Sequence, residues 1–163
     1  MTDLDELKNI PVQYNEDDRA QRCLNVFSEM GGQVNISYVN STKHIVAWHK
    51  HEKQTDYWFC VKGSFKVGIA YKEYVPSFEG EVFDKDNNVI RVSDGDEIWV
   101  VEWFYLSDKT QSTLKIPPGA YHGYKALEPN SVMLYGLTHK YDPNDEFTLK
   151  PGHFNEDWNT EDK

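Results

Sequence analysis

The stretch AWHKHEKQTDYWFCVKG, residues 47–63, decides the fold because it combines strand-like segments with two closely spaced histidines. His49 and His51 lie two positions apart, and residues two apart on a β-strand point to the same face. The run DYWFCVKG, residues 56–63, is aromatic and apolar and ends at a Lys-Gly turn signal. We therefore expect strands here, with both histidine side chains projecting together.

The segments around this stretch have the same character. QVNISYV, residues 33–39, alternates apolar and polar side chains, and this period of two indicates a strand. Similar short runs, rich in β-branched and aromatic residues and bounded by turn residues, are HIVAW (44–48), SFKVGIAY (64–71), VIRVS (89–93), EIWVVEWFYL (97–106), STLKI (112–116) and SVMLYGL (131–137). About nine strand candidates, with almost no helical periodicity after residue 31, predict an all-β double-stranded barrel or jelly roll. DKDNN, residues 84–88, is expected at the tip of an extra hairpin.

The two ends differ from this pattern. Residues 1–14 are expected to form a helical or extended lead-in, with a short helix capped by Thr2 or Asp3 and ended by Pro11. Residues 17–30 fit a helix or a strand equally well. The polar tail, residues 151–163, is expected to fray or to pack on a partner. With 163 residues in all, we expect a single domain over 1–163.

Composition narrows the class of protein. The formal net charge of −10 does not favour nucleic acid or an anionic membrane as a general partner. The two cysteines form no Cys-x-x-Cys pair, and Cys60 fits a buried thiol. The acidic start MTDLDELKNI has no apolar core of a signal peptide, so we expect a cytoplasmic protein. The aromatic surplus, 14% of residues, predicts a lined cavity or a dimer interface beyond simple core filling.

Two motifs carry candidate chemistry. The first is His49-x-His51-x4-Asp56-x6-Gly63, and the second is IPPGAYHG, residues 116–123, in which a tight turn leads into a strand that starts with His122. In this order and spacing they resemble the two motifs of the cupin proteins. The resemblance implies the cupin double-stranded β-barrel.

A narrower resemblance lies within the cupins. QVNISYVNSTKHIVAWH (33–49), WFYLSDKTQSTLKIPPGAYHGYKAL (103–127) and VMLYGLTHKYDPNDE (132–146) are similar to segments of the RmlC-like dTDP-4-dehydrorhamnose 3,5-epimerases. The likeness covers roughly residues 15–146, with an insertion at about 72–98. It implies an epimerase of a nucleotide-linked 4-keto-6-deoxy sugar, active as a homodimer and without a cofactor or metal.

The resemblance also implies roles for single residues. His49 matches the catalytic base, and Tyr135 matches the tyrosine that protonates the opposite face of the sugar. A 4-keto group acidifies the protons on the neighbouring carbons, and an imidazole is suited to remove one of them near neutral pH. Substrate contacts are expected from Arg19, Gln33, Asn35, His51, Gln54, Asp56 and His122.

The chain departs from this family at two positions. The family's arginine and lysine near the base are replaced by Val46 and Asp56. The acid that orients the base is expected near the C-terminus, with Asp157, Glu161 and Asp162 as candidates. Two alternatives therefore stand beside the epimerase: a metal-dependent cupin enzyme with His49, His51, Asp56 and His122 as ligands of Fe, Mn, Ni or Zn, and a sugar-binding cupin without catalysis.

Overall fold

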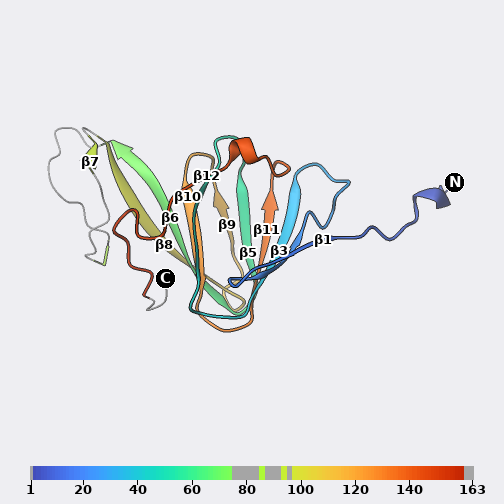
Figure 1. Ribbon diagram of the computed structural model, residues 1–163, viewed down its shortest axis with the longest axis horizontal. Coiled ribbons are helices and arrows are strands. Elements are labelled where there is room, and N and C mark those ends of the chain that lie inside the picture. Colours follow the sequence, from blue (N-terminus) through green and yellow to red (C-terminus); the bar gives the residue numbers. More distant parts are fainter. Residues whose placement is uncertain (1, 75–84, 87–92, 95–96, 160–163) are drawn as a thin grey trace.

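The computed structural model describes residues 2–74, 85–86, 93–94 and 97–159, which form two antiparallel sheets (Figure 1). Within the described residues the first sheet has the strand order β1-β2-β3-β11-β5-β9, and the second has β12-β4-β10-β6-β8-β7. Their bounds are β1 Gln13–Glu16, β2 Gln21–Leu24, β3 Gln33–Val39, β4 Ile45–Lys50, β5 Asp56–Lys62, β6 Ser64–Tyr74, β7 Ser93–Asp94, β8 Glu97–Ser107, β9 Thr113–Ile116, β10 Tyr121–Ala126, β11 Ser131–Leu137 and β12 Phe147–Thr148. The all-β, cupin-type double-stranded barrel predicted from the sequence is confirmed.

Helical structure is minor in the described part of the chain. A 3-10 helix, η1, spans Leu4–Glu6 and is capped by the Asp3 carboxylate, which accepts a hydrogen bond from Asp5 N. It ends well before Pro11, so the predicted short helix is confirmed but its extent was overestimated. A second 3-10 helix, η2, spans Pro143–Asp145 just before β12. Among the described residues, no helix is long and apolar enough to cross a membrane.

The ambiguous segment 17–30 contains strand β2, so the strand interpretation is correct there. Of the strand expected over residues 89–93, only Ser93 is described, and it begins β7. Most of the hairpin tip also lies outside the described residues. Of DKDNN, only Lys85 and Asp86 are described, and both lie in a turn.

A first core fills the space between the sheets. Alternate side chains of β6 point inward, and Phe65 and Val67 are fully buried there together with Met133 of β11. The buried thiol of Cys60 belongs to the same core, as predicted. Gly63 joins β5 to β6 at a φ of 80°, and a side chain there would clash with the Ser131 hydroxyl. The barrel therefore specifies glycine at this position through both backbone conformation and space.

A second core covers the outer face of the β12-β4-β10-β6-β8-β7 sheet. The C-terminal segment, residues 149–159, lies across this face and buries Phe154 and Trp158 against Trp48. Two buried lysines of the sheet hold the segment by its backbone: Lys66 Nζ donates to the carbonyl of Asp157 at 3.1 Å, and Lys125 Nζ donates to that of Asn159 at 2.7 Å.

The prediction that residues 151–163 fray or need a partner is therefore wrong for the described part of this tail. Although the composition of the tail is polar, it contains two aromatic residues four positions apart, Phe154 and Trp158. Their apolar surface is buried against the β12-β4-β10-β6-β8-β7 sheet of the same chain.

The two sequence motifs meet in the second sheet. Strand β10 pairs with β4 so that His122 lies directly opposite His49. On its other side His49 lies opposite Thr148 of β12. Residues far apart in sequence thus converge where β4, β10 and β12 lie side by side.

Candidate active site

A cavity of about 190 Å³ lies between the sheets and is lined from both of them. It is smaller than the roughly 300–1,000 Å³ of typical ligand pockets, so it suits a group the size of one sugar ring. The side chains that line it are Arg22, Leu24, Gln33, Asn35, Ser37, Val46, His49, His51, Gln54, Asp56, Trp58, His122, Tyr124, Tyr135, Leu137, Tyr141 and Glu146.

Most of the residues predicted to form a site meet at this cavity. His49, His51 and His122 all line it, which agrees with the projection expected from the His-x-His spacing. Arg19 is the exception: it does not line the cavity, and its guanidinium pairs with Asp17 at 2.8 Å. The lining arginine is Arg22, on the inward face of β2.

His49 is paired with a carboxylate. Its Nδ1 lies 3.2 Å from Glu146 Oε1, and the two side chains are 30% and 28% exposed. Tyr141 donates from its hydroxyl to the other oxygen of the same carboxylate at 3.2 Å. The hydrogen bond from His49 lowers the pKa of Glu146, which keeps the carboxylate ionised at neutral pH. An ionised carboxylate at Nδ1 favours the tautomer in which Nε2 carries the lone pair, as a general base requires.

Tyr135 reaches the cavity from the opposite sheet. It lies on β11 with its ring 5.4 Å from that of Trp58 and 6.3 Å from that of Tyr124, measured between centroids. Burial, followed by the neighbouring Tyr124, raises the pKa of Tyr135 well above its usual value. The phenol is therefore protonated at neutral pH and is able to donate a proton into the cavity.

A second polar cluster lies beside this pair. Single ligand atoms of His51, Asp56 and His122 all lie within 4.8 Å of one another. His51 Nδ1 lies 2.7 Å from the carbonyl oxygen of Asp145, which leaves Nε2 as its free ring nitrogen. His122 Nε2 lies 3.7 Å from Asp56 Oδ2.

Asp56 is buried, and its carboxylate accepts hydrogen bonds from Gln54 Nε2 at 2.7 Å and Trp58 Nε1 at 3.1 Å. Burial raises the pKa of Asp56 and lowers that of His122 well below its usual value. His122 is therefore neutral at neutral pH. The donor set of this cluster, two imidazole rings and a carboxylate, fits a transition metal ion.

The remaining predicted contacts, Gln33 and Asn35, form the wall next to Tyr141. Gln33 Nε2 donates to Asn35 Oδ1 at 2.9 Å, and Gln33 Oε1 accepts from the backbone N–H of Tyr141 at 2.9 Å. The two amides thus fix the segment that leads into η2 and Glu146.

Two charged lining residues, Glu146 and Arg22, were missed from the sequence. The acid that orients His49 was expected further along the chain, among Asp157, Glu161 and Asp162, whereas Glu146 is the carboxylate that lies at His49 Nδ1. Glu161 and Asp162 lie outside the described residues. The signal was present, because Glu146 ends the stretch 132–146 that carries the family resemblance. Arg22 lay in the segment whose secondary structure was ambiguous, so its inward direction was not predictable.

Comparison with known proteins agrees with this picture. A family model described as dTDP-4-dehydrorhamnose 3,5-epimerase matches residues 64–161, more than half of the chain. The "Probable low-salt glycan biosynthesis epimerase Agl13" of Haloferax volcanii is 28% identical over 121 residues, which cover 71% of this chain and 65% of that protein.

Solved structures share the fold at low identity. A dTDP-4-dehydrorhamnose 3,5-epimerase from Bacillus anthracis superposes with a TM-score of 0.58 at 16% identity, over 92% of this chain and 91% of that one. The capsular polysaccharide assembling protein CapF of Staphylococcus aureus gives a TM-score of 0.62 at 17% identity, over 87% of this chain but 33% of CapF. With the family model matched over more than half of its length, this chain belongs to the dTDP-4-dehydrorhamnose 3,5-epimerase family.

Proposed function

We propose that the protein epimerises a nucleotide-linked 4-keto-6-deoxy sugar by removing a proton next to the keto group. The observation that carries the proposal is the His49–Glu146 pair on one sheet, facing a cavity that Tyr135 lines from the other sheet. In this mechanism His49 Nε2 takes the proton from the carbon, and the electron pair moves onto the keto oxygen as an enolate. Tyr135 then returns a proton to the opposite face, which inverts the carbon.

Other side chains that line the cavity could bind the charged and hydroxyl groups of the substrate. An enolate oxygen needs hydrogen-bond donors or positive charge. Arg22 is the lining residue with a permanent positive charge, and it is placed by an ion pair to Asp17 at 3.1 Å. We assign Arg22 to an anionic part of the substrate, and Gln33, Asn35 and Gln54 to its hydroxyl groups.

The nucleotide is expected to lie outside this cavity, because the cavity has room for about one sugar ring. Support for a nucleotide comes from the Bacillus anthracis relative, whose structure is described with TDP and PPi bound. The homodimer implied by the resemblance stays a prediction.

The test is proton exchange in deuterated water. The protein is incubated with dTDP-4-keto-6-deoxyglucose and related keto sugars, and NMR follows the protons at C3 and C5. Exchange that is lost in His49→Ala and retained in His139→Ala, an exposed histidine outside the cavity, supports the proposal. Exchange at wild-type rates in His49→Ala contradicts it. Tight binding of the sugar nucleotide with no exchange in any variant leaves the sugar-binding module as the function.

A metal-dependent reaction is a second candidate, favoured by the cluster of His51, Asp56 and His122. The carbonyl of Asp145 at His51 Nδ1 is the kind of hydrogen bond that orients a metal-ligating histidine. His49 is not part of the cluster in the described structure, so the predicted four-ligand set is reduced to three residues. His51, Asp56 and His122 would hold a divalent ion, which would supply polarisation of a carbonyl oxygen of the ligand.

Metal analysis separates the two candidates. Protein purified without a histidine tag is measured for Fe, Mn, Ni and Zn, and its melting temperature is recorded with a chelator and with each metal. Stoichiometric metal that is lost in Asp56→Ala but not in His139→Ala supports the metal reaction. Metal-free protein whose melting temperature does not respond to any of these ions excludes it.

A further inference from the structure

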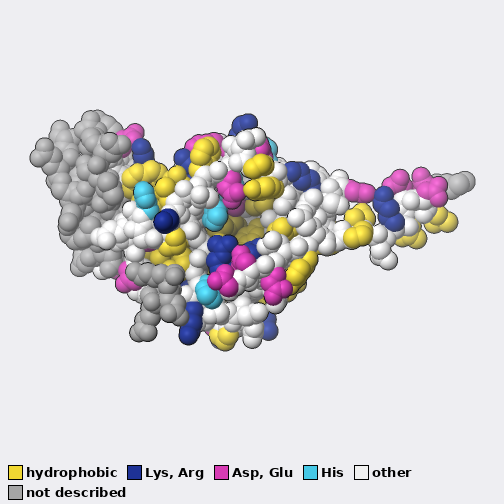
Figure 2. Space-filling view, viewed as in Figure 1, with side chains coloured by type: hydrophobic (Ala, Val, Ile, Leu, Met, Phe, Trp, Pro, Cys, Tyr) yellow, Lys and Arg dark blue, Asp and Glu magenta, His cyan; other side chains and the backbone are white. Residues whose placement is uncertain are grey.

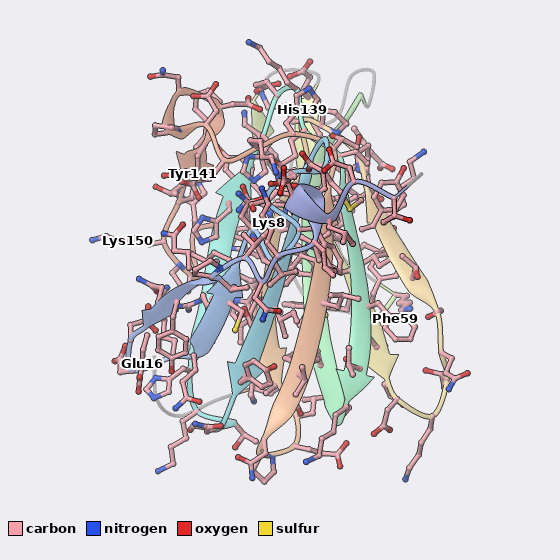
Figure 3. The ribbon with its side chains drawn as sticks, turned by 90° about the vertical axis from the view of Figure 1, so that its right-hand side faces the viewer. Lys8, Glu16, Phe59, His139, Tyr141 and Lys150 are labelled. Carbon is pink, nitrogen blue, oxygen red and sulfur yellow. The ribbon has the colours of Figure 1, made fainter. Side chains whose placement is uncertain are left out.

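Residues 138–146 connect the two sheets and carry the carboxylate that pairs with His49. They follow β11, pass through η2 and end just before β12 on the other sheet. Tyr141 and His139 of this segment lie in the upper part of the molecule in Figure 3. Before η2 the segment belongs to no helix or strand. The position of Glu146 therefore depends on the hydrogen bonds that the segment makes with the rest of the barrel.

The segment is tied on two sides. Near its end, the Asp145 carboxylate accepts hydrogen bonds from the backbone N–H groups of Glu52 and Lys53 at 2.8 and 3.2 Å, in the turn between β4 and β5. Nearer its start, the backbone N–H of Tyr141 donates to Gln33 Oε1 at 2.9 Å. Gln33 is the first residue of β3, which pairs with β11. Its side chain is thus placed beside the point at which the segment begins.

Backbone donors fix the orientation of the Gln33 amide. An N–H group donates only to the oxygen of an amide, so Oε1 faces Tyr141 and Nε2 donates to Asn35 Oδ1 at 2.9 Å. The backbone N–H of Asn25 also donates to Asn35 Oδ1 at 2.9 Å and fixes that amide in the same way. Gln33 therefore uses its oxygen and one hydrogen of Nε2 within the protein, and Asn35 presents Nδ2 to the cavity that it lines.

The hydrogen bonds continue from Tyr141 to the base. The Tyr141 hydroxyl donates to Glu146 Oε2 at 3.2 Å, and Glu146 Oε1 lies 3.2 Å from His49 Nδ1. The backbone of Tyr141 is thus held by Gln33, while its ring holds the carboxylate that faces the base. Since Tyr141 is 60% exposed, packing holds it only weakly, and the hydrogen bond to Gln33 has a correspondingly larger part in placing it.

We propose that Gln33 is a positioning residue for the base: through Tyr141 it holds Glu146 where that carboxylate orients His49. This role is additional to the substrate contact assigned to Gln33 above. Its effect on rate rests on the proposed epimerisation, whereas its effect on the orientation of the His49 ring does not depend on any substrate.

The network also gives the substrate a route to the base. Asn35 lies opposite Tyr135 in the pairing of β3 with β11, beside the residue proposed as the acid. A ligand oxygen that accepts from Asn35 Nδ2 polarises the amide, and hydrogen bonds in a chain strengthen one another. Binding at this wall therefore tightens the bond from Gln33 and, through it, the placement of the carboxylate at His49.

The first test is a double-mutant cycle on the rate of deuterium incorporation. Gln33→Met keeps the length of the side chain but removes both hydrogen bonds, and it should lower kcat roughly 2- to 12-fold, the rate equivalent of one neutral hydrogen bond. Tyr141→Phe removes the hydroxyl that reaches Glu146, so Gln33→Met added to it should lower kcat by less than about twofold more. A Gln33 that only contacts the substrate would raise KM, and its effect would multiply with that of Tyr141→Phe.

Gln13→Met is the matched control. Gln13 is exposed on β1 and does not line the cavity. It follows the N-terminal arm, residues 2–12, which projects away from the barrel (Figures 1 and 2). The control should leave kcat and KM unchanged. Melting temperatures of all variants well above the assay temperature separate a loss of rate from unfolding.

The second test needs no substrate. Proton–nitrogen NMR of the imidazole rings, recorded at about pH 9, above the range in which imidazoles ordinarily titrate, shows which ring nitrogen carries the proton, and His49→Ala assigns the signals of His49. The wild-type protein should carry the proton on Nδ1, facing Glu146. In Gln33→Met the two nitrogen signals of His49 should move toward each other as the second tautomer becomes populated, and in Gln13→Met they should not move.

The two tests separate this proposal from the proposed epimerisation. Signals of His49 that are the same in Gln33→Met and wild type overturn the role of Gln33, as do effects on kcat that multiply with Tyr141→Phe. A wild-type protein that exchanges no proton of any keto sugar refutes the epimerisation instead, and the nitrogen signals of His49 then decide the role of Gln33 by themselves.

Discussion

Replacing Glu146 by Gln tests the central feature of the site, the carboxylate that orients His49. The side chain keeps its size, so the cavity keeps its shape. The charge is lost, and the amide has one oxygen to offer where the carboxylate has two. In the native protein one oxygen faces His49 Nδ1 and the other accepts from the Tyr141 hydroxyl. If the amide oxygen turns to Tyr141, its NH2 group faces Nδ1 and favours the tautomer with the proton on Nε2, which is inactive as a base.

The size of the effect follows from the hydrogen bond that changes. A hydrogen bond to a charged group contributes roughly 1.5–3 kcal/mol, and each 1.36 kcal/mol of barrier is tenfold in rate. The side chains of His49 and Glu146 are about 70% buried, so solvent screens only part of the energy of this hydrogen bond. We expect kcat for proton exchange to fall roughly 10- to 150-fold. Because Glu146 acts through His49, KM should change little.

The assay is the initial rate of deuterium incorporation next to the keto group, measured by NMR at several substrate concentrations. Glu102→Gln is the matched control, since Glu102 is exposed on β8 and does not line the cavity. A Glu146→Gln variant with kcat within twofold of wild type, or with the whole loss in KM, would refute the role given to Glu146. A melting temperature of Glu146→Gln that stays well above the assay temperature ensures that the loss of rate is not unfolding.

Three further predictions concern other parts of the molecule. Tyr135→Phe should reduce inversion of the carbon roughly 100-fold or more while His49 still exchanges a proton, so NMR should show deuterium in recovered substrate with little epimer. Gly63→Ala should lower the free energy of unfolding by roughly 2–4 kcal/mol because it adds a clash to a positive φ; Gly152→Ala, at a φ of 88° with open space around it, should lose only the conformational part in the same denaturant titration. The lowered pKa of Glu146 means that its ionised form stabilises the fold above its ordinary value of 4.5, and that this contribution disappears as the pH falls through the lowered pKa. The melting temperatures of wild type and Glu146→Gln should therefore differ at pH 7 and converge on acidification, and a difference that grows on acidification would contradict this assignment.

The central strands were predictable because their patterns are local. QVNISYV has a strict period of two, and β3 spans the same residues, 33–39. The edge strands β1 and β12 were not predictable, because β12 has two residues and β1 has four exposed ones. Such short strands depend on their neighbours, and no signal within a few residues specifies them.

The site was predictable where a motif carries its geometry. The spacing of His49 and His51 fixes a shared direction, and both line the cavity with His122. Glu146 was not assigned because its partner lies 97 residues away in sequence. Arg22 was not found because the direction of a side chain needs the register of its strand, and here the sequence did not settle even the type of element.

The position of Glu146 has a consequence for the synthesis of the protein. A ribosome adds about 5–20 residues each second, so the 97 residues between His49 and Glu146 take roughly 5–20 s. For most of that time β4 lacks β10, and for all of it β4 lacks β12, the two strands that flank it in the finished sheet. A nascent chain halted before residue 140 would carry its histidine base but no partner for it, and its aromatic Trp48 would still lack the cover of Phe154 and Trp158. The base is thus complete only after residue 146 has been added, long after His49 itself has been made.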